Sequence, residues 1–402
     1  MINRNHKIVD RILGIFALIT ILAAWLIGAA QGAAEVEPFL SQAFSEASRF
    51  ESVNGQTYAA YSSDTPGRLL GYVSVGETNG YGGPMKVAVG VGLQGNIIGL
   101  AVVDSKETPS FFKKVVGSPL FQSLIGKSYA DSFLLGEDVD GVTGATYTSR
   151  AIAQSALQGS RSAASQQLGL KIPAAQAEKI QFGIPEIMLI ALFAAGYFGH
   201  QSRFKYTKQA RWAAMIVGMT VLGFIYNSPL TLSSINKFLL GFWPKWQTGL
   251  YWYLLIGGIL FVFTVDNKNP YCQWFCPFGA AQECMGVIGG AKARSTGKYP
   301  HFLKWFQRGL AWLAIVVALV FRSPGVSSYE IFGALFSLTG ATIQFVLLGI
   351  VLIASLFIKR PWCNYLCPIH PIDEFIRMAR GWVVELWKKI KNKRQDAIPA
   401  KS

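Results

Sequence analysis

Four of the five cysteines in the 402-residue chain fall into two matching motifs. The first reads Cys272-Gln-Trp-Phe-Cys276-Pro, and the second reads Cys363-Asn-Tyr-Leu-Cys367-Pro. A separation of four residues is expected to place both sulfurs of a motif on one face of a helix. Two such pairs supply four thiolates, which is the number that an iron-sulfur cluster takes. We therefore predict that these four cysteines together hold a metal centre.

Three other interpretations of the cysteines stay open at this point. They could be small buried packing residues, a zinc site with four thiolates, or a thiol–disulfide relay. The duplicated spacing and the shared aromatic interior disfavour packing alone. The ferredoxin run of three closely spaced cysteines before Cys-Pro is missing, so the type of cluster is not fixed. Cys284 has no counterpart after the second motif and is interpreted as a packing residue.

A second candidate is a hydroxyl-rich segment that reads Asp140-Gly-Val-Thr143-Gly144-Ala145-Thr146. It resembles the flavinylation motif, Asp-x-x-Ser/Thr-Gly-Ala-Thr, of domains in sodium-pumping quinone reductases and Rnf complexes. The resemblance implies that Thr146 carries FMN through a phosphoester and that a flavin transferase attaches it. The small neighbours of Thr146 would admit a bulky cofactor. The alternative is an ordinary turn before a helix, capped by one of the hydroxyl residues that follow, Thr148 or Ser149.

Two further stretches match the same flavin-binding family. One is the glycine-rich run that begins Gly80-Tyr81-Gly82, and the other is the Lys-Glu-Thr-Pro run that contains Glu107 and Thr108. The resemblance implies that Tyr81, Gly82, Glu107 and Thr108 lie around the flavin. The family continues with Gly-Leu-Gly after the proline, whereas this chain continues with Ser-Phe-Phe.

The elements that position these flavin residues read as an α+β domain between about residues 40 and 170. Short β-prone runs separated by glycines cover Leu69 to Val75, Lys86 to Val91 and Ile97 to Val103. Gly95-Asn96 marks a turn, and a long helix is predicted after Ser149.

The rest of the chain is apolar: 51% of all residues are hydrophobic and only 15% are charged. We predict about six transmembrane helices. They cover Ile12 to Ala30, Phe182 to Gly199, Trp212 to Tyr226, Leu250 to Val265, Leu310 to Phe321 and Ile343 to Ile358. A cleaved signal peptide is the competing interpretation of the first stretch. Thr231 to Phe242 and Tyr329 to Leu338 are expected to lie outside the membrane or to re-enter it.

The formal net charge of +15 indicates an acidic partner or a membrane surface. The basic excess lies in the apolar part of the chain, loop by loop, which disfavours nucleic-acid binding. With the N-terminus inside, the two outer loops hold only Lys237, Lys245 and Arg322. Because cytoplasmic loops collect Lys and Arg, we predict an inner-membrane protein with an extracytoplasmic flavin domain and a cytoplasmic C-terminal tail that contacts membrane lipids.

The predicted fold class is therefore an α+β extracytoplasmic FMN-binding domain followed by an all-α polytopic membrane bundle. Residues 1–34 are expected to form a signal-anchor helix and residues 35–175 the covalent FMN-binding domain. Residues 176–380 are expected to form the membrane domain with both Cys-x3-Cys-Pro motifs, and residues 381–402 a basic cytoplasmic tail.

This order of parts resembles the NosR/NirI family of membrane flavoproteins, and its short form resembles the membrane component associated with reductive dehalogenases. The resemblance implies electron transfer between quinol or a cytoplasmic donor and an extracytoplasmic reductase or redox protein. The quinone pool would then be a partner, and a bound quinone could bridge the two redox sites. The alternatives are a redox sensor or maturation factor for a partner reductase, and a flavin-dependent reductase with its own substrate.

Overall fold

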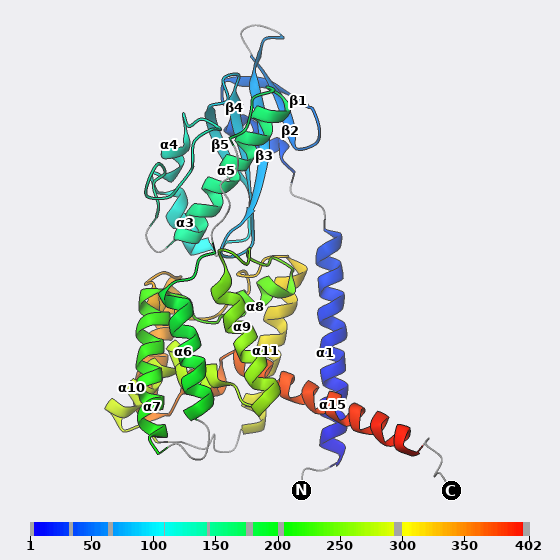
Figure 1. The fold of residues 1–402 in the computed structure, drawn as a ribbon, viewed down its shortest axis with the longest axis vertical. Helices are drawn as coiled ribbons and strands as arrows, with labels where there is room; N and C mark the ends of the chain where they lie inside the picture. The colour runs from blue at the N-terminus through cyan, green and yellow to red at the C-terminus, as the bar shows by residue number, and fades with distance from the viewer. Residues whose placement is uncertain are drawn as a thin grey trace.

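The computed structural model describes residues 4–31, 35–62, 67–107, 109–142, 145–173, 180–199, 205–292 and 300–396. Within these ranges an α+β region stands at one end of the molecule and a helical region at the other, as Figure 1 shows. The long N-terminal helix α1 (Arg4–Ala30) runs beside the helical region.

The α+β region is a five-stranded antiparallel sheet with strand order β1-β2-β3-β4-β5 and helices on both faces. Its strands are β1 (Ala47–Ser52), β2 (Thr57–Ser62), β3 (Leu69–Asn79), β4 (Pro84–Gly92) and β5 (Ile97–Ser105). Its helices are α2 (Glu37–Ala43), α3 (Pro109–Val116), α4 (Leu120–Leu124) and α5 (Thr146–Gln166). Side chains alternate along a strand, so Val87 and Val89 of β4 pack on the core beneath α5, whereas Ala88 packs on the core with Leu40 of α2.

The three strands predicted from sequence correspond to β3, β4 and β5, and each continues beyond its predicted end. The strands β1 and β2 were not predicted, because they carry Ala, Ser, Arg and Glu in place of a run of branched apolar residues. Helix α5 begins at Thr146, earlier than predicted. Thr148 and Ser149 therefore lie inside the helix, and the interpretation of either one as its N-cap was wrong.

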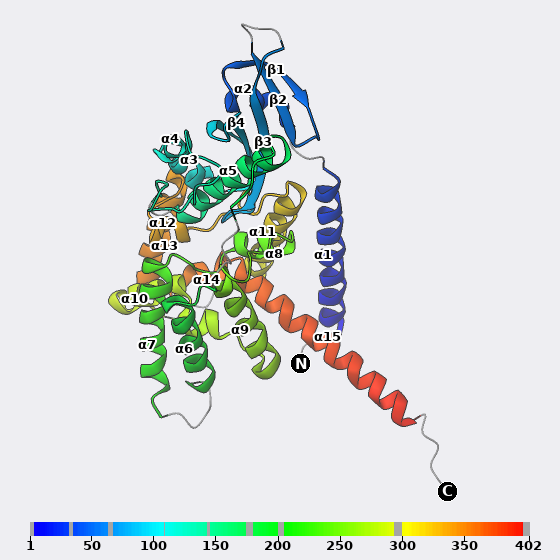
Figure 2. The ribbon, with the colours of Figure 1, turned by 45° about the horizontal axis from the view of Figure 1, so that its top comes forward.

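The helical region contains ten α-helices and two π-helical segments among the described residues. Its first part comprises α6 (Ile184–Gly199), α7 (Thr207–Val217), η1 (Gly218–Ile225), α8 (Leu232–Leu239), α9 (Leu250–Asp266), η2 (Tyr271–Phe275) and α10 (Pro277–Gly289). Its second part comprises α11 (Pro300–Val320), α12 (Phe332–Phe336), α13 (Thr342–Phe357), α14 (Pro361–Tyr365) and α15 (Ile369–Asp396). In Figures 1 and 2, α8 lies at the end of this region that faces the sheet.

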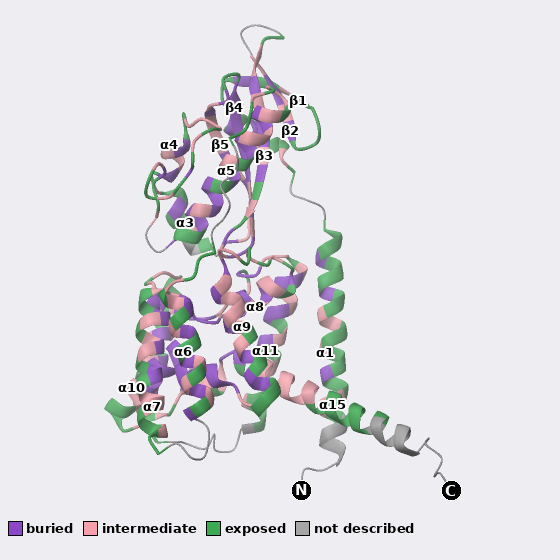
Figure 3. Cartoon of the chain, viewed as in Figure 1, coloured by how far each residue is buried: buried purple, intermediate pink, exposed green. Residues whose placement is uncertain are grey.

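Two helices are long and apolar enough to cross a membrane, at Val9–Ala30 and His301–Val320. Three shorter apolar helices cover Ile184–Gly199, Leu250–Asp266 and Thr342–Phe357. Each of the six predicted stretches overlaps a helix, with the third divided between α7 and η1. Figure 3 shows α1 as mostly exposed, although its side chains are apolar.

Helix α1 is joined to the helical region at two levels. The indole N–H of Trp312 in α11 donates to the Thr20 hydroxyl at 2.9 Å. Nearer the start of α1, Gly14 leaves room for the ring of Trp382, and Arg11 forms an ion pair with Glu385 of α15. Helix α15 therefore crosses α1, as both ribbon views show (Figures 1 and 2).

Candidate functional site

The loop between β3 and β4 lies against the segment that follows β5. A Cβ atom at Gly82 would collide with the carbonyl oxygen of Lys106, and one at Gly80 would collide with Oε1 of Glu107. Only glycine permits such a close approach. The backbone N–H of Gly82 donates to Oε1 of Glu107 at 3.2 Å. The two predicted flavin segments therefore meet, with Gly82 and Glu107 in direct contact.

Glu107 also connects this contact to helix α5, because Oγ1 of Thr148 donates to its Oε2 at 3.0 Å. Burial raises the pKa of Glu107, whereas the bonds from Gly82 and Thr148 and the positive charge of Lys237 lower it. Burial also raises the pKa of Tyr81 to about 12. The centre of the predicted flavin site is thus a buried, hydrogen-bonded group in contact with three segments of the chain.

Thr146 is exposed and is the first residue of α5. Ala145 precedes it and has no side-chain oxygen with which to cap the helix. Ser149 holds the turn, since its hydroxyl donates to the carbonyl of Ala145 at 3.0 Å and accepts from the N–H of Val142 at 3.3 Å. A helix N-terminus carries partial positive charge and free N–H groups, so a phosphate on Thr146 would be favoured there.

The structure describes one of the four remaining predicted flavin residues. Asp140 is exposed, and its backbone N–H donates to the hydroxyl of Ser123 at 3.2 Å. Thr108, Thr143 and Gly144 lie outside the described residues.

A lysine from the helical region reaches the glycine-rich loop. Nζ of Lys237 in α8 donates to the carbonyl oxygens of Gly80 at 2.6 Å and Tyr81 at 2.9 Å. Burial lowers the pKa of Lys237 to about 8, and the negative charge of Glu107 opposes this change. A second contact joins the same regions, because the side-chain amide of Asn79 donates to the carbonyl of Trp243 at 3.3 Å.

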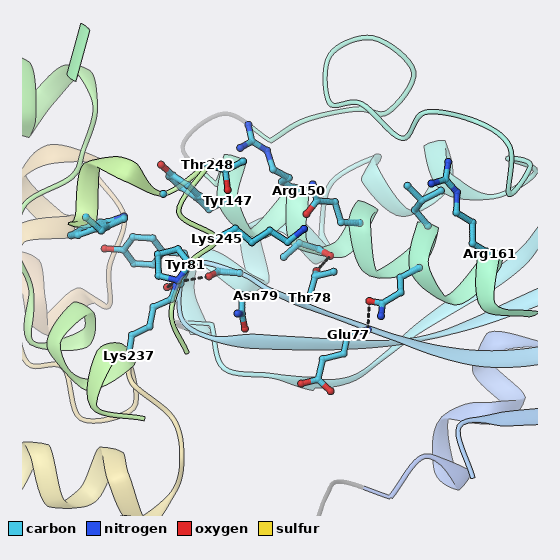
Figure 4. A pocket seen from close by; sticks show the side chains of 18 of the residues that line it. Glu77, Thr78, Asn79, Tyr81, Tyr147, Arg150, Arg161, Lys237, Lys245 and Thr248 are labelled. Carbon is cyan, nitrogen blue, oxygen red and sulfur yellow. Dashed lines mark hydrogen bonds between the residues drawn. The ribbon is translucent and has the colours of Figure 1, made fainter. Parts of the chain in front are cut away.

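A cleft of about 880 Å³ lies beside this junction, as Figure 4 shows. Its volume falls within the range of small-molecule sites. Tyr147 and Arg150, which follow Thr146 on α5, line the cleft together with Tyr81. Arg150, Arg161, Lys237 and Lys245 supply positive charge, and several aromatic and aliphatic side chains supply apolar surface. These groups fit a cofactor that combines a flat aromatic ring system with a phosphate.

The two cysteine motifs each span a break between helices. Cys272 lies in the π-helical segment η2, whereas Cys276 has φ −58° and ψ 120° and immediately precedes α10. Cys363 lies in α14, and Cys367 follows the end of that helix. The prediction that each pair shares one helical face was wrong, because the proline after the second cysteine disfavours helical geometry in the residue before it and starts a new helix.

Amide side chains surround the cysteines. Nδ2 of Asn269 lies 3.4 Å from the sulfur of Cys272, and Nε2 of Gln282 lies 3.2 Å from the sulfur of Cys363. Gln307 donates to the carbonyl of Cys367 at 2.9 Å. Donors aimed at sulfur favour the thiolate form, which is the form that binds metal.

The four thiols lie close enough together to affect one another's pKa values. Burial raises the pKa of Cys363 to about 11, and the thiol of Cys276 adds to this increase. The pKa of Cys367 is raised by burial and by the charges of Cys363, Cys272 and Cys276. Burial also raises the pKa of Cys272, and the positive charge of Arg360 offsets part of this increase. The guanidinium of Arg360 also donates to the backbone carbonyl of Cys272 at 2.9 Å.

Within the described part of the chain, no three His, Cys, Asp or Glu side chains gather tightly enough to hold a single metal ion. All five cysteines are free thiols, and four of them interact electrostatically as described above. A zinc ion needs its four ligands within about 2.3 Å of one centre. A 4Fe-4S cluster binds its four thiolates through separate iron atoms, so the sulfurs stand farther apart. Four thiolates are the donor set of both a structural zinc site and a 4Fe-4S cluster.

A continuous series of contacts connects the cysteine motifs to the glycine-rich loop. The ring of Trp362, next to Cys363, lies 6.2 Å from the ring of Tyr329, measured between centroids. The adjacent Glu330 accepts the N–H of Leu232, the first residue of α8, at 2.8 Å. Thr231, the N-cap of α8, shares a side-chain hydrogen bond with Tyr81.

Sequence reasoning missed most residues that complete the two sites. These are Arg150, Lys237, Lys245 and Trp252 at the cleft, and Asn269, Gln282, Gln307 and Arg360 near the cysteines. A weak signal existed for Asn269, which precedes Cys272 by three residues at the end of the polar run that begins at Asp266. Lys237 carried a weaker signal, as one of only three basic residues in the predicted outer loops.

Two protein-family models match the chain in these regions. A model described as an FMN-binding domain matches residues 80–159, which contain all of the predicted flavin residues. A model described as a 4Fe-4S binding domain matches residues 248–295 and 341–390, which contain one cysteine motif each. The cleft is lined partly by residues of the first match, including Tyr81, Tyr147 and Arg150.

Several curated relatives match parts of the chain. Protein NirI of Paracoccus denitrificans is 28% identical over 203 residues, which are 46% of this chain and 29% of NirI. The putative electron transport protein YccM of Escherichia coli is 30% identical over 25% of this chain and 32% of YccM. One component of the Na(+)-translocating ferredoxin:NAD(+) oxidoreductase complex of Acetobacterium woodii is 31% identical over 23% of this chain and 48% of that component.

The chain thus spans less than half the length of each of these three relatives. Two of these relatives are described as an electron transport protein and as part of an oxidoreductase complex. The chain thus contains an FMN-binding domain and a 4Fe-4S binding domain, a combination that supports a flavoprotein of the NosR/NirI type.

Proposed function

We propose that the protein transfers electrons between a 4Fe-4S cluster held by Cys272, Cys276, Cys363 and Cys367 and an FMN attached through a phosphoester to Thr146. The observation that carries the proposal is the series of contacts from Trp362 to Tyr81, which joins the two cofactor regions within one chain. FMN exchanges one or two electrons and can therefore couple a two-electron donor to a one-electron carrier.

At the flavin site, Thr146 provides the hydroxyl for attachment, and the uncapped N-terminus of α5 stabilises the phosphate. Asp140, Thr143, Gly144 and Ala145 complete the recognition motif for a flavin transferase. Gly82 and Glu107 shape the loop beside the cofactor, where Glu107 is held by Gly82 and Thr148. Tyr81 lines the cleft itself.

At the cysteine site, the protein supplies the thiolates and stabilises their charge. Asn269 and Gln282 donate toward two sulfurs, and Arg360 lies nearby as a counter-charge. Large buried rings, including Trp274, Phe278 and Trp362, exclude water from the surroundings. A dry, hydrogen-bonded setting of this kind fixes the ligand geometry and tunes the redox potential.

We further propose that α1, α6, α7 with η1, α9, α11 and α13 all span the inner membrane, with the FMN domain outside. Three of these helices have 16 or 17 residues and rise about 25 Å, slightly less than a typical hydrocarbon core. Support comes from apolar side chains exposed on the outer surfaces of the helices. These include Ile187 and Phe198 on α6, Phe261 and Val265 on α9, and Ile350, Ile353 and Phe357 on α13.

In this arrangement the electron donor is the quinone pool or a cytoplasmic protein, and the acceptor is an extracytoplasmic reductase or redox protein. The cleft at the junction lies next to the FMN region. A bound quinone or an external partner would exchange electrons with the flavin there.

The test is to add a soluble quinol analogue to anaerobic membranes and to follow loss of flavin absorbance. Wild-type flavin is expected to be reduced, and Cys363→Ser protein with intact flavin is expected to be reduced more slowly by an order of magnitude. Wild-type flavin that stays oxidised with quinol while remaining reducible by dithionite would refute quinol as the donor. Equal rates in the two proteins would refute the role of the cysteine centre.

A further inference from the structure

The cleft beside the FMN region has two walls from different parts of the chain. Tyr81, Tyr147 and Arg150 belong to the residues matched by the FMN-binding model. The opposite wall comes from the helical region and includes Lys237 of α8 and Trp252 of α9. The second wall therefore lies outside the residues that the FMN-binding model covers.

Specific contacts hold the two walls together. Lys237 bonds to the carbonyls of Gly80 and Tyr81, and Figure 4 shows its side chain directed toward Tyr81. Phe242 packs against Gly83, where a Cβ atom would lie 2.9 Å from its ring. Gly83 also has a φ of 147°, which favours glycine and lets the loop pass close to the helical region.

The helical wall has the chemistry that a flavin ring requires. Trp252 and Phe238 offer aromatic surfaces against which a flat ring can stack. Lys237 and Lys245 place positive charge on the same side of the cleft. A cation near the ring favours the reduced, more negatively charged flavin over the oxidised form.

We propose that the flavin is bound between both walls, with Trp252 against its ring and Lys237 as the cation that raises its reduction potential. The inference rests on the proposed attachment of FMN to Thr146. Thr146 is exposed one turn before Arg150, which lines the cleft, so a cofactor tethered at Thr146 is within reach of the cleft. The helical region is then a structural part of the flavin site and the direct neighbour of the cofactor.

The first test uses flavin fluorescence in the purified full-length protein, because an indole ring in contact with a flavin quenches its emission. Trp252→Phe is expected to lengthen the flavin fluorescence lifetime severalfold. The matched control is Trp246→Phe, since Trp246 is exposed and lies outside the set of residues that line the cleft. An unchanged lifetime in the Trp252 variant, with flavin still attached, would overturn the placement of the ring.

The second test measures the flavin midpoint potential by spectroelectrochemistry. Lys237→Met is expected to lower the potential, whereas Lys237→Arg keeps the charge and is expected to stay near the wild-type value. Equal potentials in all three proteins would overturn the role of the lysine. Wild-type protein that carries no covalent flavin would refute the proposed function and this inference together, whereas flavin-loaded protein with no response in either test would refute this inference alone.

Discussion

The flavin cleft and the cysteine centre are built in opposite ways. The cleft lies at the junction of two regions and is lined by cations, hydroxyls and amides, and the proposed attachment residue, Thr146, is exposed. The cysteines lie inside the helical region among buried rings such as Trp274, Phe275 and Trp362. An exposed cofactor can exchange electrons with outside partners, whereas an enclosed one exchanges them only through neighbouring protein. The difference supports the proposal that external partners exchange electrons at the flavin side.

The largest expected effect concerns the attachment residue of the exposed site. Thr146→Ala is expected to abolish the flavin fluorescence that survives denaturing gel electrophoresis, because no other hydroxyl occupies that helix position. Thr148→Ala is the matched control: its hydroxyl is two residues away but is buried and bonded to Glu107, so the covalent flavin should remain. A fluorescent band in the Thr146 variant would move the attachment site elsewhere.

The enclosed cysteine centre can be tested in the same way, by replacing one of its proposed ligands. Cys363→Ser is expected to remove the paramagnetic signal of the reduced cluster from anaerobically purified protein, because one of four ligands is replaced by a poor iron ligand. Cys284→Ser serves as the control, since this half-buried cysteine lies outside both motifs and its loss should leave the signal intact. An unchanged spectrum in the Cys363 variant would exclude the shared site.

A smaller effect, on the stability of the fold, is expected from Glu330, which lies in the series of contacts between the two sites. Burial raises the pKa of Glu330 to about 8, against the partly compensating bonds from Leu232 and Ser328. Below about pH 4.5, Glu330 is protonated in the folded and the unfolded protein, and its burial costs no charge. As pH rises from about 4.5 to 8, the unfolded protein ionises Glu330 first, so the folded protein loses stability. The full loss has an upper limit of about 5 kcal/mol.

The melting temperature of wild-type protein in detergent is therefore expected to fall between pH 5 and pH 8, because Glu330 becomes ionised. Glu330→Gln keeps an acceptor for Leu232 without the charge, so its melting temperature should depend less on pH and be higher at pH 8. Identical pH profiles for the two proteins would show that Glu330 is not buried at the junction.

The smallest effect concerns the tuning of the cluster. Gln282→Leu removes the amide that donates to the sulfur of Cys363 and accepts the N–H of Trp362. The cluster is expected to be retained with a lower midpoint potential, because the N–H donor stabilises the more negative reduced state. The potential is measured by redox titration of the paramagnetic signal. A potential equal to that of the wild type would show that this donor does not act on the cluster.

The sequence was informative where the chemistry is local. Two Cys-x3-Cys-Pro motifs and one Thr-Gly-Ala-Thr motif indicate their cofactors through residue types at short spacing, and both family matches agree with them. Strands β3 to β5 were likewise predictable, and each of the six predicted apolar stretches overlaps a helical segment, because periodicity and length are visible in single segments.

The sequence was uninformative where distant segments meet. Lys237 reaches Gly80 across 157 positions, and Gln282 reaches Cys363 across 81, and no local pattern encodes either pairing. The backbone of the cysteine motifs was also predicted wrongly, since helical spacing was assumed through Cys276 although a proline follows it. Cofactor identity was thus readable from short motifs, whereas the surroundings that tune the cofactors depend on the tertiary fold.

The most direct test of electron transfer between the two sites uses right-side-out proteoliposomes with both cofactors reduced. Ferricyanide, which does not cross the membrane, is added outside, and oxidation of the cluster is followed by rapid-freeze paramagnetic resonance. Fast oxidation is expected in the wild type, and oxidation slower by an order of magnitude or more is expected in Thr146→Ala protein, which lacks the flavin. Equally fast oxidation of the cluster in both proteins would contradict the claim that its electrons leave through the flavin.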